Sequence, residues 1–130
     1  MAIDFAMTPR QRKLKYDARE FAREELRPVA ERADALADPQ AAFVAMKPVF
    51  EAAAALGYTT SFLPAEYGGG GASIVDTLIT TEELAAVDGG FPTIVLVNGL
   101  ALMPLAWYGD EKLCERWIGR AVDPANTAFL

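Results

Sequence analysis

The sequence contains no histidine and only one cysteine, Cys114. A zinc site draws on several Cys, His or acidic ligands, and a Cys–His nucleophile pair needs both residue types. We therefore expect no metal site and no Cys–His catalysis within this chain. A single cysteine cannot form an intrachain disulfide, and no apolar segment follows a basic start at the N-terminus, so we expect a cytoplasmic location.

Basic residues are in deficit: 12 Lys and Arg stand against 18 Asp and Glu, which gives a formal net charge of −6. This balance argues against a nucleic-acid partner, because phosphate binding requires a basic stripe. A few basic residues cluster near the N-terminus, where they alternate with apolar positions and are soon followed by glutamates. They are predicted to form a solvated helix face: Arg10, Arg12, Lys13, Lys15 and Arg19.

A long uninterrupted hydrophobic run is missing. The most apolar stretch, residues 91–107, is broken by Thr93, Asn98, Gly99 and Pro104. At about 17 residues it lies at the short limit for a membrane helix. We expect a buried core helix here and no membrane span.

The sequence is rich in helical signals instead. Its 130 residues suit one domain, and 52% of them are hydrophobic. Thr8 and Gln11 have the spacing of a capping box, and Gly57 is placed to end a helix. Five helical segments are predicted: 9–36 with a kink at Pro28, 39–56 with a break near Lys47, 73–88, 92–108, and one after Asp110. The predicted fold class is all-α, a helical bundle of about five helices in which 92–108 is the most buried.

The segment between the second and third helices has a different character. Residues 58–63 have an extended composition, Pro64 stops them, and four consecutive glycines occupy positions 68–71. A flexible connector is one interpretation, and an ordered turn would need a geometric reason for the glycines. A phosphate-binding loop is a weaker alternative, because the lysine and the following Ser or Thr of a P-loop are missing.

Four motifs occur in a fixed order along the chain. They are the helix 18–28 with its acidic end and proline, the turn Leu63-Pro-Ala-Glu-Tyr-Gly-Gly-Gly-Gly71, the segment Thr81-Glu-Glu-Leu-Ala-Ala-Val-Asp88, and the helix that begins Tyr108-Gly-Asp-Glu-Lys112 and continues through Trp117. In this order they resemble the N-terminal domain of the flavin-dependent acyl-CoA dehydrogenase family. Leu113 and Cys114 stand where that family commonly has a Gln-Lys pair, a departure that affects surface contacts.

The resemblance implies that residues 1–130 are one N-terminal helical domain. The family's middle β-domain and C-terminal helical domain are absent from this chain. Family members bind FAD between those two domains and oxidise an acyl-CoA thioester to the trans-2-enoyl-CoA. The catalytic carboxylate comes from the C-terminal domain, so no catalytic residue is expected here. The implied partners are an acyl-CoA substrate, an electron-transfer flavoprotein as electron acceptor, and other subunits of a homo- or hetero-oligomer.

The same resemblance implies substrate-binding residues on the helix after the Glu-Glu-Leu-Ala segment. In the family this helix lines one side of the acyl-chain cavity, and the matching positions here are Thr93, Leu96, Val97, Leu100 and Met103. Leu96 would leave the deep end of the cavity apolar, which favours an aliphatic or aromatic acyl group. Gly99 is expected to allow close approach of a partner or of the acyl chain. Leu130 aligns with the edge of the family's flavin-binding stretch.

Several residues have a structural interpretation beside the functional one. Glu82 and Glu83 form a carboxylate pair, for which a capping or interdomain role is expected in place of catalysis. Trp107, Tyr108 and Trp117 are expected to have core and interface roles. Two other functions stay open: a non-catalytic helical assembly or binding module with the same fold, and a flavin acyl-CoA oxidase or monooxygenase relative.

Overall fold

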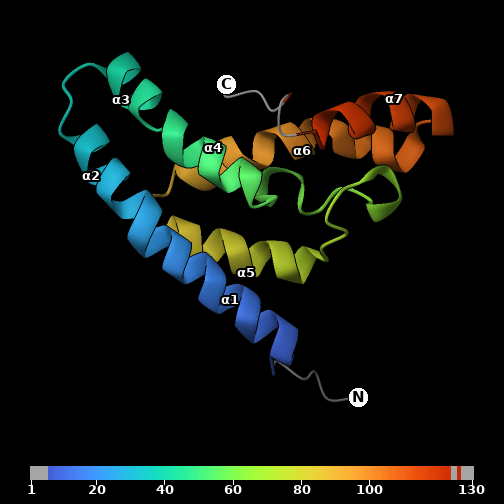
Figure 1. The fold of residues 1–130 in the computed structure, drawn as a ribbon, viewed down its shortest axis with the longest axis horizontal. Helices are drawn as coiled ribbons and strands as arrows, with labels where there is room; N and C mark the ends of the chain where they lie inside the picture. The colour runs from blue at the N-terminus through green and yellow to red at the C-terminus, as the bar shows by residue number, and fades with distance from the viewer. Residues whose placement is uncertain (1–5, 124–125, 127–130) are drawn as a thin grey trace.

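The helices form five rods in the computed structural model, which describes residues 6–123 and Asn126 (Figure 1). In these residues no β-strand occurs, and the all-α prediction is confirmed. The α-helical segments are α1 (Pro9–Phe21), α2 (Arg27–Asp34), α3 (Pro39–Ala45), α4 (Lys47–Ala55), α5 (Ile74–Ala85), α6 (Phe91–Tyr108) and α7 (Glu111–Ala121).

The first rod consists of α1, a π-helical turn at Ala22–Leu26, and α2. It begins with the predicted capping box, in which the Gln11 amide donates to the Thr8 hydroxyl and the Thr8 amide donates to the Gln11 side chain. The π turn lies directly before Pro28, whose ring nitrogen has no hydrogen to donate to a carbonyl one turn earlier. The irregularity predicted at Pro28 is confirmed, and it takes the form of a π-helical turn, which is wider than an α-helical one.

The second rod, α3 with α4, is interrupted at Met46. Asp38 caps its start by accepting hydrogen bonds from the Gln40 and Ala41 amides. Pro48 follows the interruption in the first turn of α4, where its missing N–H is harmless. Gly57, in the left-handed conformation with φ of +79°, then ends the helix as predicted.

The main core lies where the first rod, α4, α5 and the start of α6 meet. Its fully buried side chains include Leu26, Phe50, Leu84, Phe91 and Val95. Burial of each such side chain stabilises the fold by roughly 1.5–3 kcal/mol. A smaller cluster of Leu63, Cys114 and Ile118 joins the loop region to α7, which lies alongside α6 at the other end of the molecule (Figure 1).

The prediction that residues 92–108 form the most buried helix is wrong. Only 24% of α6 is buried within the structure. Phe91, Val95 and Gly99 face the rest of the domain, while Leu100 and Trp107 lie on exposed parts of the helix. Hydrophobic residues all round a helix indicate that every face avoids water, but this chain covers only one side of it.

The glycine segment is a folded turn, so the extended character expected for residues 58–63 and the interpretation as a flexible connector are both wrong. Tyr58–Thr60 and Ala65–Tyr67 form 3-10 turns. The amides of Gly69, Gly70 and Gly71 then donate to carbonyls within residues 60–64. A Cβ added to Gly69 would lie 2.3 Å from the Leu63 carbonyl oxygen, and one added to Gly70 would lie 2.5 Å from that of Ser61. This close backbone approach is the geometric reason for the glycines.

Candidate functional site

The five predicted substrate-binding residues share one face of α6. Thr93 and Val97 are exposed, Leu96 and Met103 are half-buried, and Leu100 is 58% exposed. The structure therefore places them along one side of the helix, but this chain leaves only Thr93, Val97 and Leu100 uncovered. Leu96 borders a small cavity beside Tyr58 and α5, and Met103 packs against the cluster of Leu63, Cys114 and Ile118. We call this set, Thr93, Leu96, Val97, Leu100 and Met103, the outer face of α6. That it lines an acyl cavity stays a prediction.

Gly99 does not belong to that face. A Cβ at Gly99 would lie 2.3 Å from Cζ and 2.8 Å from Cε1 of Phe62, so the ring of Phe62 fills the space that the glycine leaves. The expected approach of an acyl chain to Gly99 is wrong, because a side chain of the same domain already occupies the position. Gly99 thus allows α6 to pack closely on the Tyr58–Leu63 segment.

An open hollow of about 390 Å³ borders the outer face of α6. Val97 and Leu102 line it from α6, and Trp117 and Arg120 line it from α7. At the end of α6, Trp107 is 66% exposed and Tyr108 is 88% exposed, and their rings meet edge to face. The expected core role of these aromatic residues is wrong, since they lie at the surface of the α6–α7 hairpin. Their interface role remains a prediction.

The carboxylates of α5 hold the first rod in place. Glu83 is buried and accepts two hydrogen bonds of 2.8 Å from Arg19, while Lys15 lies 3.3 Å from the same carboxylate. Hydrogen bonds from Arg19 hold the pKa of Glu83 below its ordinary value against the opposing effect of burial, and Lys15 acts in the same direction as Arg19. Glu82 is exposed, and its charge acts on Arg19 more weakly than that of Glu83. Glu83 therefore has a structural role within the domain that differs from the expected capping, whereas the interdomain role stays a prediction.

A second ion pair connects the start of α1 to the start of α5. Arg10 donates to Asp76 at 2.9 Å, and Asp76 also accepts from the Ser73 amide within a capping box. Burial alone would raise the pKa of Asp76, but the hydrogen bonds from Ser73 and Arg10 outweigh it and lower the pKa. Three members of the N-terminal basic cluster thus pair with α5. The prediction of a solvated face is confirmed for Arg10 and Arg19, whose side chains are 69% and 44% exposed, while Lys15 is half-buried.

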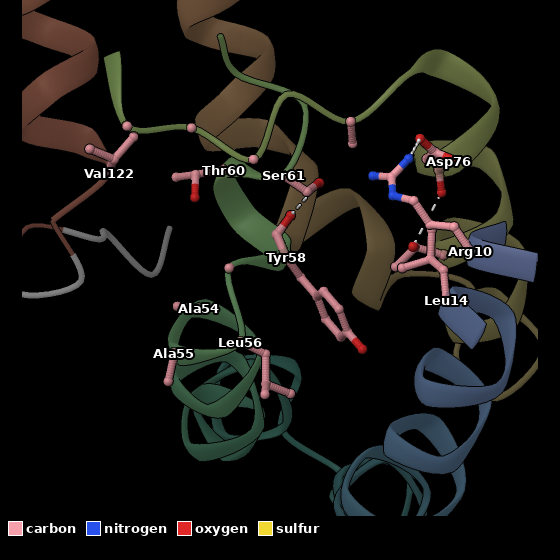
Figure 2. Close-up of a pocket in the computed structure, with 16 residues that line it drawn as sticks. Arg10, Leu14, Ala54, Ala55, Leu56, Tyr58, Thr60, Ser61, Asp76 and Val122 are labelled. Carbon is pink, nitrogen blue, oxygen red and sulfur yellow. Dashed lines mark hydrogen bonds and ion pairs between the residues drawn. The ribbon is translucent and has the colours of Figure 1, made fainter. Parts of the chain in front are cut away.

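Sequence reasoning missed a hollow of about 420 Å³ beside this ion pair (Figure 2). Its lining comes from α1, the end of α4, the glycine turn and α5, with Arg10, Tyr58 and Asp76 among its polar groups. The segments are far apart in the sequence, so no local pattern indicates it. Asp76 cannot act as a free base here: Arg10 and Ser73 engage one oxygen, and the other is buried without a hydrogen-bond partner.

Little in the described residues bears on a cofactor. Leu130, the predicted flavin neighbour, and the extended ending 128–130 lie outside them. Across residues 6–123 and Asn126, no group of three or more His, Cys, Asp or Glu is placed to hold a metal ion. These residues offer no flavin-binding set against which FAD can be fitted.

By length and composition, α6 would suffice to cross a membrane. This is weak support for a span, because helices of soluble proteins pass the same test. Its 18 residues have a mean hydropathy of 1.5. The absence of a membrane span stays a prediction.

The comparisons with known proteins agree on one family. The family model described as acyl-CoA dehydrogenase, N-terminal domain, matches residues 8–124. The probable acyl-CoA dehydrogenase FadE25 of Mycobacterium tuberculosis (strain ATCC 25618 / H37Rv) is 38% identical over 96 residues, which cover 73% of this chain and 23% of that protein. Acryloyl-CoA reductase (NADH) of Anaerotignum propionicum is 30% identical over 118 residues, which cover 91% of this chain and 28% of the relative.

Solved structures contain the same fold. A nitroalkane oxidase in complex with spermine superposes with a TM-score of 0.85 at 25% identity, over 94% of this chain and 28% of the oxidase. A chain of the electron transferring flavoprotein structure from Acidaminococcus fermentans gives a TM-score of 0.73 at 25% identity, over 95% and 31%. The chain spans about a quarter of the length of the curated relatives it matches. With helices, motif order and family match in agreement, the chain belongs to the family of acyl-CoA dehydrogenase N-terminal domains.

Proposed function

We propose that this chain acts as the N-terminal domain of an FAD-dependent acyl-CoA dehydrogenase that oxidises an acyl-CoA thioester to the trans-2-enoyl-CoA. Its direct contribution is one wall of the acyl cavity, formed by the outer face of α6. The family match supports the flavoprotein class, and the names of FadE25 and acryloyl-CoA reductase point to CoA thioesters.

One observation carries the proposal. The residues that the family places along the acyl chain are mostly apolar, and three of them, Thr93, Val97 and Leu100, lie exposed on the side of α6 left uncovered by this domain. A contiguous apolar surface of this kind is costly to leave in water and marks a binding face. Leu96 makes the deep end of that wall apolar, so we expect an aliphatic or aromatic acyl group as substrate.

The rest of the catalytic apparatus lies elsewhere in this proposal. FAD, when bound, supplies the redox chemistry, and the domain described above contributes substrate position and exclusion of water. The catalytic base and most flavin-binding residues belong to the middle and C-terminal domains. An electron-transfer flavoprotein is the proposed acceptor, and a cytoplasmic oligomer is the proposed form.

A flavin oxidase is the second candidate, because nitroalkane oxidase structures share the fold with TM-scores of 0.82 to 0.85. The two candidates differ in what reoxidises the flavin. A dehydrogenase protects reduced flavin from oxygen and passes electrons to a protein acceptor, whereas an oxidase reduces oxygen to hydrogen peroxide.

The test uses the purified full-length protein and saturated acyl-CoA thioesters. We expect a flavin absorbance band, bleaching by acyl-CoA without oxygen, and turnover with an electron-transfer flavoprotein or a dye as acceptor. Peroxide formation at a similar rate would favour the oxidase. Absence of both flavin and acyl-CoA turnover would overturn the proposal and favour the non-catalytic helical module.

A further inference from the structure

Phe62 and Gly99 make a contact that leaves no room for a side chain at position 99. The added Cβ would have three ring atoms of Phe62 within 2.9 Å, and the nearest at 2.3 Å. Ordinary contacts of this kind begin at 3.4 Å. A methyl group at this position therefore requires the half-buried ring of Phe62, the helix, or both to move, by about 1.1 Å in total.

If the ring of Phe62 stays in place, helical geometry gives the direction in which α6 moves. Residues two apart lie about 160° apart around a helix, so Val97 is almost opposite Gly99. Pushing α6 away from Phe62 moves Val97 outward, toward the space that the outer face of α6 borders. Val97 is 37% exposed, so nothing in the described residues covers it fully.

We propose that Phe62 is a positioning residue. Its ring contacts Gly99 and fixes the position of α6, and the position of α6 sets the depth of the acyl cavity. The inference rests on the proposed function, because it takes the outer face of α6 as a cavity wall. The ring acts as a stop behind the helix and touches no substrate. A displacement of about 1 Å is comparable to the length that one methylene adds to an extended acyl chain, so the stop would decide which chain lengths fit.

The experiment measures kcat/KM for a series of saturated acyl-CoA thioesters of increasing length, with the full-length protein. We expect Gly99→Ala to shift the optimum toward shorter acyl chains. The longest well-accepted chain should lose roughly ten-fold or more relative to shorter ones, the usual cost of one misfitting methylene. Adding Phe62→Leu to Gly99→Ala should restore kcat/KM for longer acyl chains, because the smaller side chain leaves space for the methyl group at position 99.

Gly119→Ala is the matched control. Gly119 also lies within a helix, α7, but a Cβ there meets nothing within 4 Å. This variant should keep the wild-type chain-length profile. Thermal unfolding adds a second readout: Gly99→Ala should lower the melting temperature with Phe62 present and lower it less, or raise it, in combination with Phe62→Leu.

The outcomes separate the two proposals. Wild-type protein that turns over no acyl-CoA refutes the proposed function and the cavity-depth inference with it, whatever the melting temperatures. Turnover with a Gly99→Ala profile like that of Gly119→Ala overturns the inference and leaves the proposed function standing. If Gly99→Ala fails to fold, Phe62→Leu alone decides, since it should extend activity to longer acyl chains and an unchanged profile overturns the stop.

Discussion

At the scale of single residues, Leu96 carries the prediction about substrate class. Glutamate at this position would place a charge at the deep end of an apolar cavity, which is costly without a partner. We expect Leu96→Glu to reduce kcat/KM for aliphatic acyl-CoA by at least about ten-fold and to change the preferred acyl group.

The matched control for Leu96 is Leu113→Glu on α7, where the leucine is also partly exposed but lies on another helix. That variant should keep the wild-type substrate profile. If Leu96→Glu gives the same acyl preference as wild type, Leu96 is not part of the cavity wall.

Glu83 carries a prediction about stability. Glu83→Gln removes the charge that Arg19 and Lys15 share, and we expect a loss of about 1–3 kcal/mol in the free energy of unfolding at pH 7. Because the folded-state pKa of Glu83 is lowered, its contribution is complete above the ordinary value of 4.5 and is lost as the pH falls below it. Chemical denaturation at several pH values should show the difference between variant and wild type shrinking in acid.

Glu82→Gln is the control for that measurement, since Glu82 is the exposed neighbour on the same helix. Its effect should stay within about 0.5 kcal/mol at all pH values. Equal effects of the two substitutions would mean that the contact between Glu83 and Arg19 does not stabilise the fold.

At the scale of elements, the glycine turn is a rigid device for joining α4 to α5. Gly70→Ala places a methyl group 2.5 Å from the Ser61 carbonyl oxygen and 2.8 Å from its Cα, and these backbone atoms cannot swing away as a side chain would. We expect a destabilisation of about 1–3 kcal/mol, measured by thermal or chemical unfolding. Gly89→Ala, where a Cβ meets nothing within 4 Å, should be close to neutral.

The elements also show which parts of the structure local sequence can predict. Thr8, Ser73 and Asp110 are capping residues whose partners lie within three positions, and all three helix starts are as predicted. The pairs formed by Arg10 and Arg19 with α5 span 66 and 64 residues, so only the folded chain brings them together. The glycine turn belongs to the same class, because its reason is a backbone segment several residues earlier.

For the candidate site, too, some predictions follow from local sequence and others depend on segments far away in the chain. Helical spacing puts Thr93, Leu96, Val97, Leu100 and Met103 along one side of α6, where the structure leaves three of them exposed and two half-buried. Hydrophobicity on all sides of α6 could not tell which face this domain covers, so the helix was wrongly expected to be buried. The sequence suggests a partner or an acyl chain beside Gly99, whereas the neighbour is Phe62, from a segment whose path the sequence does not predict.

At the scale of the whole molecule, the uncovered face of α6 predicts how the isolated chain behaves. Leu100, Trp107 and Tyr108 are large, apolar or aromatic, and more than half exposed. A surface of this kind drives association when no other domain covers it. We therefore expect residues 1–130 to self-associate, with a sedimentation coefficient that rises with concentration in analytical ultracentrifugation.

Leu100→Lys should shift the equilibrium toward monomer, whereas Leu36→Lys, at an exposed leucine beyond the end of α2, should not. A chain that stays monomeric at high concentration would mean that the face of α6 is not a strong association surface by itself.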